Sequence, residues 1–89
     1  MSHVKHFLKF YVNIYYMKIN EIKDIFAERL ADLMQDKNLN SVQLSKLVSI
    51  PRTSISNWLN KKRLVQVDAL IKFAQFFEVT TDYLLGRED

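Results

Sequence analysis

The sequence predicts an all-α fold, and three observations support this prediction. The 89-residue chain contains one glycine, Gly86, and one proline, Pro51, so it has almost none of the turn residues on which β-hairpins depend. From residue 21 onward, apolar residues recur every three or four positions, as they do on one face of a helix. Apolar residues make up 48% of the chain, which is enough for a packed core. We therefore expect one small domain of five helices over residues 21–86.

The first two helices of this domain are separated by the segment KNLN. The spacing predicts the first helix over about residues 21–36, with an inward face of Ile22, Ile25, Phe26, Leu30, Leu33 and Met34. Asn40 or Ser41 can then accept hydrogen bonds from the free N–H groups that begin the second helix. This second helix is short, and its expected inward residues are Leu44, Leu47 and Val48.

A tight connection, SIP, leads to a third helix at about residues 52–60. We expect Ile50 to lie in the core, and Pro51 suits the start of a helix because it has no N–H group to satisfy. The apolar residues of this helix are spaced for a single face and comprise Ile55, Trp58 and Leu59. We assign Trp58 to the core, as the anchor of the helix.

The last two helices follow the loop KKRLVQ. The fourth helix is predicted over about residues 67–78, with an inward stripe of Val67, Leu70, Ile71, Ala74 and Phe77. Thr80 or Thr81 can cap the fifth helix, TDYLL, which Gly86 ends as a C-cap. So small a core does not need all four aromatic residues at Phe73, Phe76, Phe77 and Tyr83. We therefore expect one or two of them to form an exposed face for dimerisation.

The two ends of the chain fall outside this pattern. Residues 1–20 form an extension with aromatic and β-branched residues at positions 7–16, which leaves a strand, an additional helix and an apolar extension open. The extension is either a dimerisation element or a mis-annotated start, because Met17 followed by KINEI resembles a natural beginning of the domain. An intact mass from the native source that includes residues 1–16 would refute the second hypothesis. Residues 87–89 are a short C-terminal tail.

The chain offers little for catalysis or for metal binding. It has no cysteine, and both histidines lie within the first six residues. No catalytic residue, cofactor or metal site is therefore predicted, and an enzyme is not expected. Lys5, Lys9 and Asn13 interrupt the apolar run near the N-terminus, so no membrane span is expected. That run also lacks the small-residue cleavage site of a signal peptide, and we expect a cytoplasmic protein.

Basic charge is concentrated in one segment of the chain. Residues 37–63 contain six basic groups and no acidic group, whereas residues 1–36 contain five of each and residues 64–89 contain two basic and five acidic groups. The six basic residues are Lys37, Lys46, Arg52, Lys61, Lys62 and Arg63. This distribution is typical of a surface that binds a polyanion. The alternative is a solvated basic surface without a partner.

The second and third helices, with the tight turn between them, match a helix-turn-helix arrangement, in which the second helix of the pair enters the DNA major groove. One face of that helix must be anchored in the core by large apolar side chains. The other face must carry hydrogen-bonding groups that reach base edges close to phosphate, where Asp and Glu would be repelled. Residues 52–60 meet both demands.

The stretch LNSVQLSKLVSIPRTSISNWLNKKRLVQVDALIKFAQFFEVTTDYLLG, residues 39–86, resembles the Cro/repressor-type helix-turn-helix family of phage repressors and XRE-type regulators. The matching positions are Leu39, Leu44, Val48, Ile55, Trp58, Asn60, Val67, Leu70 and Ala74, with the closing VTTDYLLG. With Ile22–Met34 as the preceding helix, the resemblance covers about residues 21–86. It implies a five-helix lambda-repressor-like domain whose partner is double-stranded DNA.

The resemblance also implies which residues contact DNA. The base-reading positions fall on Arg52, which could bind guanine O6 and N7, on Asn57, which could pair with adenine, and on Thr53, which could contact a thymine methyl group or a phosphate. The phosphate-binding positions are Ser41, Asn60, Lys61, Lys62 and Arg63. Ser54 and Ser56 are additional candidates, although exposed polar positions without a DNA contact are an equal alternative for both. Asn57 as a surface residue without a partner is also left open.

Five positions depart from the usual pattern of the family. Met34 and Leu59 stand where many relatives carry a buried Arg–Glu ion pair, and an apolar pair avoids the desolvation of two charges. Lys61 and Val65 replace a usual glycine and proline, which puts the geometry of the loop after the third helix in question. Ser49 replaces the usual glycine of the turn, so we expect an unusual backbone conformation there.

These features predict a sequence-specific DNA-binding transcriptional regulator of bacterial or phage type. We expect a repressor that reads the major groove with the helix at about 52–60, as a homodimer on a palindromic operator. The alternative is a protein-interaction module, such as an antitoxin or anti-regulator, that uses the same fold to bind a protein partner. The surplus of aromatic residues and the apolar extension favour this alternative.

Overall fold

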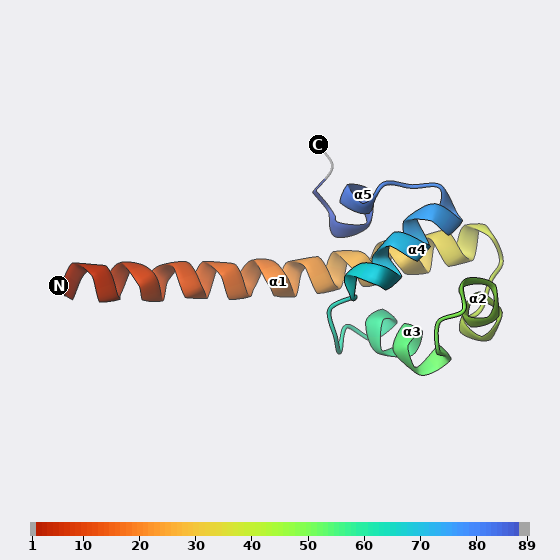
Figure 1. Cartoon of the computed structure of the whole chain (residues 1–89), viewed down its shortest axis with the longest axis horizontal. Helices are drawn as coiled ribbons and strands as arrows, with labels where there is room; N and C mark the ends of the chain where they lie inside the picture. Colours follow the sequence, from red (N-terminus) through yellow and green to blue (C-terminus); the bar gives the residue numbers. More distant parts are fainter. Residues whose placement is uncertain (1, 88–89) are drawn as a thin grey trace.

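The computed structural model describes residues 2–87, and the side chains of residues 18–87. Over this range the chain is all-α, as predicted, and forms five helices without a strand (Figure 1). The helices are α1 (Ser2–Asp36), α2 (Ser41–Val48), α3 (Arg52–Leu59), α4 (Val67–Phe77) and α5 (Thr81–Leu85). Residues 1, 88 and 89, which include most of the predicted tail, lie outside the described residues.

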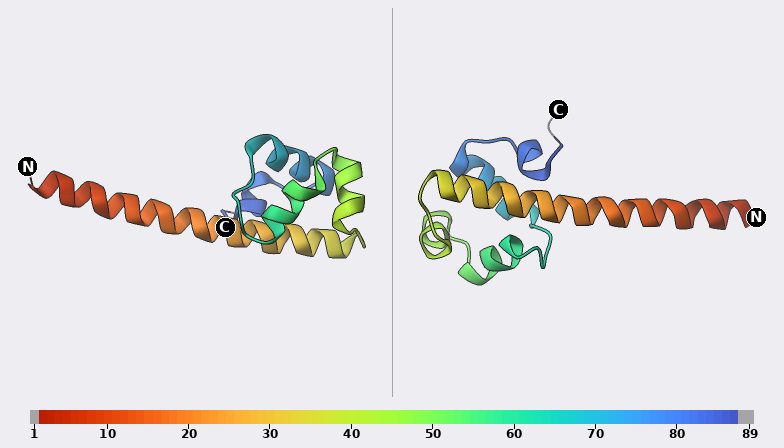
Figure 2. Two further views of the ribbon diagram at one scale, coloured as in Figure 1. Left: turned by 90° about the horizontal axis from the view of Figure 1, so that it is seen from below. Right: turned by 180° about the vertical axis from the view of Figure 1, so that it is seen from behind.

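The first helix is much longer than expected. It begins at Ser2 instead of near residue 21, so the extension at residues 2–20 is an additional stretch of helix that is continuous with the first helix of the domain. Its second half packs against the other helices, while its first half projects away from them (Figure 1, Figure 2). This projection accounts for the elongated outline of 55 × 28 × 19 Å. No helix in the described part of the chain is long and apolar enough to cross a membrane.

The core lies between the second half of α1 and the four shorter helices. Its centre is a cluster of three aromatic rings, in which the Trp58 ring stands edge-on to Phe26 and Phe73 with centroids 6.5 and 5.7 Å away. Around it lie the other buried apolar residues, Ala27, Leu30, Met34, Leu44, Val48, Ile50, Ile55, Val65, Ala69, Leu70, Ala74, Phe77 and Leu84. The predicted core positions of Ile50 and Trp58 are thus confirmed.

Three aliphatic residues that were expected in the core lie on the surface. Leu47 is 57% exposed, Val67 is 71% exposed and Ile71 is 45% exposed. The expected inward stripe of α4 is therefore confirmed at Leu70, Ala74 and Phe77 and wrong at Val67 and Ile71, and the helix also buries Ala69 and Phe73. In so small a domain, the neighbouring helices cover only part of the apolar face of a short helix, so some of its apolar residues stay exposed. The periodicity of the sequence alone does not predict which residues of the apolar face remain exposed to solvent.

The aromatic residues do not form the exposed face that was expected. Phe73 and Phe77 are buried, and Phe76 and Tyr83 are half-buried against the core. The Phe76 ring stands edge-on to Phe77 at 4.9 Å. The large apolar side chains that are exposed among the described residues are all aliphatic, namely Val42, Leu47, Leu64, Val67 and Ile71.

Helix α5 is attached to α1 through polar and steric contacts. The Thr80 side chain caps α5 by accepting a hydrogen bond from the Tyr83 N–H at 3.0 Å, as predicted. Arg29 of α1 donates a hydrogen bond to the Tyr83 carbonyl, and its guanidinium lies 4.4 Å from the centre of the Tyr83 ring. Gly86 ends the helix with φ of 73°, in contact with Ile25. These contacts set the register of α5 against α1.

Candidate nucleic-acid interface

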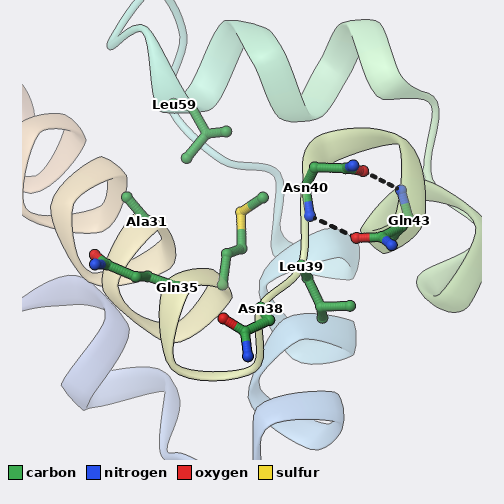
Figure 3. A pocket seen from close by; sticks show the side chains of 8 residues that line it. Ala31, Gln35, Asn38, Leu39, Asn40, Gln43 and Leu59 are labelled. Atoms are coloured by element: carbon green, nitrogen blue, oxygen red, sulfur yellow. Dashed lines mark hydrogen bonds between the residues drawn. The ribbon is translucent and has the colours of Figure 1, made fainter.

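The candidate interface begins at the N-terminus of α2, where a capping box fixes the backbone. The Asn40 side chain accepts a hydrogen bond from the Gln43 N–H at 2.8 Å, and the Gln43 side chain accepts one from the Asn40 N–H at 2.9 Å (Figure 3). Asn40 is therefore the cap, and Ser41 is the first residue of the helix. Ser41 is half-buried, and it stands at the helix terminus that favours an anion such as phosphate.

The turn between α2 and α3 has the backbone conformation that the sequence predicted. Ser49 lies in the left-handed region, with φ of 56° and ψ of 47°, a conformation that glycine adopts most readily. The Ser45 hydroxyl donates a hydrogen bond to the Ile50 carbonyl at 2.6 Å, and the Ile50 N–H donates to the Ser45 carbonyl at 3.2 Å. Ser45 therefore holds the turn closed from both directions. Sequence reasoning missed this role, because a serine inside a short helix carries no signal for it.

Helix α3 has an anchored face and an open face. Ile55 is fully buried and Trp58 is 5% exposed, so these two side chains fix the helix against the core. On the open side, Arg52 and Thr53 are exposed and Asn57 is half-buried. The two remaining polar candidates of this helix, Ser54 and Ser56, are also half-buried. The helix starts at Arg52, with Pro51 as the residue before its first turn instead of within it.

The segment after α3 presents the cations that were predicted to contact phosphate. Asn60, Lys61, Lys62 and Arg63 are all exposed. Lys61 has a positive φ of 61°, a backbone conformation that glycine adopts most readily. The Lys62 N–H donates to the Asn57 carbonyl at 2.9 Å, which ties this loop to the end of α3.

Three of the predicted contact residues, Ser56, Asn60 and Lys61, have side-chain partners within the described chain. The Asn60 side-chain amide donates a hydrogen bond to the Ser56 hydroxyl at 3.3 Å. The Lys61 ammonium lies 3.6 Å from a carboxylate oxygen of Glu28 in α1, and both side chains are substantially exposed. An exposed pair of this kind contributes about 0–1 kcal/mol, so it leaves Lys61 free to exchange Glu28 for a phosphate.

The segment that forms most of the candidate interface carries charge of one sign. All six basic residues of the segment 37–63 are exposed, and the segment contains no acidic residue. The only ion pair formed by these six within the described part of the chain is the weak one between Lys61 and Glu28. The ridge made by α3 and the following loop therefore offers side-chain donors flanked by cations, without a competing carboxylate on the same segment.

Beside this ridge lies a shallow pocket between α1, α2 and α3. It is lined by Ala31, Met34, Gln35, Asn38, Leu39, Asn40, Gln43 and Leu59 (Figure 3). Met34 is buried and Leu59 is half-buried at this pocket, so the two residues that replace an ion pair of the family share one apolar site. This arrangement avoids the cost of removing two charges from water.

The comparisons with known proteins agree with this geometry. A family model described as helix-turn-helix matches residues 30–84, which contain α2, α3 and α4. The HTH-type transcriptional activator BcrR of Enterococcus faecalis is 38% identical over 64 residues, which cover 72% of this chain and 31% of BcrR. The HTH-type transcriptional regulator ImmR of Bacillus subtilis (strain 168) is 27% identical over 63 residues, which cover 71% of this chain and 50% of ImmR.

A third relative extends the same pattern. The uncharacterized HTH-type transcriptional regulator YobD of Bacillus subtilis (strain 168) is 26% identical over 65 residues, which cover 73% of this chain and 58% of YobD. The chain thus spans between 31% and 58% of the lengths of these three relatives. No solved structure is significantly similar to the chain.

Proposed function

Because the chain belongs to the Cro/repressor-type helix-turn-helix family of DNA-binding transcriptional regulators, we propose that it recognises a specific operator sequence in the cytoplasm by inserting α3 into the major groove. The observation that supports this proposal most strongly is the division of α3 into two faces. Ile55 and Trp58 anchor one face in the core, and Arg52, Thr53 and Asn57 are available on the other. We further propose that the chain acts by binding and not by catalysis.

The proposed roles of these residues follow from their chemistry. Arg52 can donate two hydrogen bonds to O6 and N7 of guanine, and the amide of Asn57 can pair with N6 and N7 of adenine. Thr53 can contact a thymine methyl group or a phosphate. Phosphate contacts are assigned to Ser41, Asn60, Lys61, Lys62 and Arg63, which set the position of α3 without reading sequence. Ser54 and Ser56 remain additional candidates for DNA contacts.

We propose that two copies bind a palindromic operator. A single helix of eight residues reads only a few base pairs, so a symmetric pair is needed for specificity. The two half-sites would be spaced by about one helical turn of DNA, roughly 34 Å. A dimer bound in this way would repress a promoter that overlaps the operator, because it blocks access for the polymerase.

Activation is the second candidate for the direction of regulation. It is favoured by one observation, namely that BcrR, at 38% identity, is named as a transcriptional activator. Transcription in vitro from a promoter with the selected operator distinguishes the two: added protein lowers the yield of transcript if it represses and raises it if it activates. An antitoxin or anti-regulator would instead change the yield only when its protein partner is present.

The assignment of base readers is tested by alanine substitution. The operator is first selected from a random DNA pool at two salt concentrations, which also gives the number of phosphate contacts. Arg52→Ala and Asn57→Ala are each expected to lose about 1–3 kcal/mol of binding and to relax discrimination at a defined base pair. Lys62→Ala is expected to weaken all sequences alike and to reduce the salt dependence.

Lys18→Ala serves as the control, because Lys18 is an exposed cation of α1 outside the basic segment. It is expected to leave affinity nearly unchanged. If Arg52→Ala, Asn57→Ala and Lys62→Ala weakened all DNA sequences equally, the assignment of the base readers would be wrong. Selection that yields no preferred sequence would contradict the proposed function itself.

A further inference from the structure

The exposed face of α4 carries two aliphatic and two charged residues, and the Asp68 carboxylate accepts a hydrogen bond from the Ala69 N–H of the same helix at 2.9 Å. Val67 and Ile71 are 71% and 45% exposed, and they stand one helical turn apart on the same stripe. Asp68 and Lys72 form a second exposed stripe beside the first. Neither charged group has an ion-pair partner among the described residues. We call these four residues the α4 face.

We propose that the α4 face binds the α4 face of a second copy of this chain, with the two helices antiparallel across a two-fold axis. This inference rests on the proposed function, which calls for two copies on one operator. It adds the surface through which they meet and the residues that determine the pairing.

The charges of the α4 face support a second copy as the occupant, because the face is complementary to itself. In a two-fold contact, residue i of one copy meets residue j of the other, and residue j meets residue i. Residues 68 and 72 are each two positions from residue 70. An axis at the level of residue 70 in two antiparallel helices therefore places Asp68 of each copy opposite Lys72 of the other. Val67 and Ile71 lie beside these pairs and bury apolar surface at the same contact.

The position of α4 suits this arrangement. The helix starts four residues after Arg63, the last of the cations assigned to phosphate, so the proposed contact lies next to the DNA-binding segment. An 11-residue helix is only about 16 Å long, and a contact between two of them is smaller than the roughly 800 Å² per partner of a stable complex. We therefore expect weak self-association in solution and cooperative binding on DNA, where two adjacent half-sites raise the effective concentration.

The proposal is tested by measuring cooperativity on the palindromic operator. Cooperativity is the ratio of the affinity for the second half-site to the affinity for an isolated half-site, so it separates pairing from DNA recognition. Asp68→Lys leaves two lysines on each α4 face, and Lys72→Asp leaves two aspartates. Like charges then face each other across the contact, so each variant is expected to reduce cooperativity about tenfold or more. An equimolar mixture of the two variants is expected to regain it, because a face with two lysines then meets a face with two aspartates.

The mixture separates pairing between copies from an effect within one helix. Residues 68 and 72 are also i and i+4 neighbours, and a role confined to one chain would not be restored by mixing two singly substituted chains. Ile71→Lys is expected to abolish cooperativity. Val42→Lys is the matched control, because Val42 is an aliphatic residue of α2 whose exposure of 40% is close to that of Ile71, and it is expected to leave cooperativity unchanged.

Three results would overturn the proposal: non-cooperative binding of the unmodified chain, cooperativity that survives both charge reversals, or a mixture that behaves like its components. The second of these would mean that the copies meet through another surface. In each case binding to an isolated half-site would persist, and the proposed function would stand. If no half-site were bound at all, the proposed function would fail, and sedimentation of the same variants at high protein concentration would still decide whether the α4 faces pair.

Discussion

Among residues 2–87, four residues other than glycine have a positive φ, and each lies within two positions after the end of a helix. They are Asn38 (54°), Ser49 (56°), Lys61 (61°) and Glu78 (57°). Asparagine visits this region readily, but for most other side chains the left-handed conformation costs about 1–2 kcal/mol. The surrounding packing must therefore supply that energy. In the turn between α2 and α3 it is supplied by the burial of Ile50 and by the two hydrogen bonds between Ser45 and Ile50.

Ser49→Gly is expected to stabilise the protein. Glycine adopts the left-handed conformation without the steric penalty of a Cβ atom, and this gain exceeds the greater conformational entropy of glycine in the unfolded chain. The expected rise in the free energy of unfolding is about 0.5–1 kcal/mol. It can be measured by chemical denaturation followed through the fluorescence of Trp58, the only tryptophan in the sequence.

The control for this prediction is Ser54→Gly, within α3. The same chemical change in a helix is expected to lower the free energy of unfolding by about 0.5–1 kcal/mol, because it adds unfolded-state entropy without relieving strain. Equal effects of the two substitutions would show that the turn at Ser49 is not strained.

At the scale of elements, the attachment of α5 depends on the absence of a side chain at Gly86. A Cβ atom at this position would lie 2.8 Å from both Cδ1 and Cγ2 of Ile25, and φ is 73°. Gly86→Ala is therefore expected to lower the free energy of unfolding by about 1–3 kcal/mol, through backbone strain and through displacement of α5 from α1. Thermal and chemical denaturation would both report this loss.

The neighbouring Arg87 provides the comparison for Gly86. Its side chain is exposed, so Arg87→Ala is expected to change the free energy of unfolding by no more than about 0.5 kcal/mol. If Gly86→Ala were as well tolerated as Arg87→Ala, the contact between Gly86 and Ile25 would not hold α5 in place.

The ends of the short helices could be predicted from the sequence, whereas the sides that they bury could not. Gly86 occupies the cap that was expected, and Asn40 and Thr80 are each one of the two residues expected for their caps, as their strong capping preferences indicate. Leu47, Val67 and Ile71 satisfy helical periodicity equally well, but the arrangement of neighbouring helices leaves them exposed. That arrangement is a tertiary property and is absent from the spacing of apolar residues.

The length of α1 was hidden for a related reason. Aromatic and β-branched residues at positions 7–16 have intrinsic preferences for strands, which kept a strand open as an alternative. However, residues 2–36 contain neither glycine nor proline, so nothing in the sequence ends a helix before Asp36. The absence of helix-ending residues therefore predicts the length of α1 better than the strand preferences of residues 7–16 do.

At the scale of the whole molecule, the domain and the projecting half of α1 are separable. Among the side chains of residues 18–87, the buried core residues lie between Phe26 and Leu84, and residues 2–16 belong to the half of α1 that projects from the other helices (Figure 1). A chain that starts at Met17 is therefore expected to unfold cooperatively, with a free energy of unfolding close to that of the full chain. It is also expected to bind an isolated half-site with unchanged affinity.

Calorimetry and half-site titration of the two chains test this expectation. A shortened chain that unfolded without a cooperative transition would show that the projecting segment is part of the folding unit. Loss of half-site binding with an intact thermal transition would instead give residues 1–16 a direct role in DNA recognition.

The candidate interface could be outlined from the sequence because its two requirements are both local. Apolar spacing at Ile55 and Trp58 identifies the anchored face, and the run from Lys61 to Arg63 identifies the exposed basic segment that we propose to bind phosphate. The hydrogen bond from Ser45 to Ile50 and the contact between Lys61 and Glu28 were not foreseen. The first depends on the closed form of the turn, and the second joins residues that are brought together only by folding.

The left-handed residues at the helix ends also bear on how this protein can evolve. Glycine would relieve backbone strain at three positions, Ser49, Lys61 and Glu78. Substitutions that stabilise the protein are therefore available at each of them. Most changes at Arg52, Thr53 or Asn57 that alter operator preference will carry some cost in stability. A lineage can offset that cost at Ser49 or Glu78, away from the proposed base-reading positions. Under the proposed function, new operator specificities are therefore more accessible to this domain than its small core would suggest.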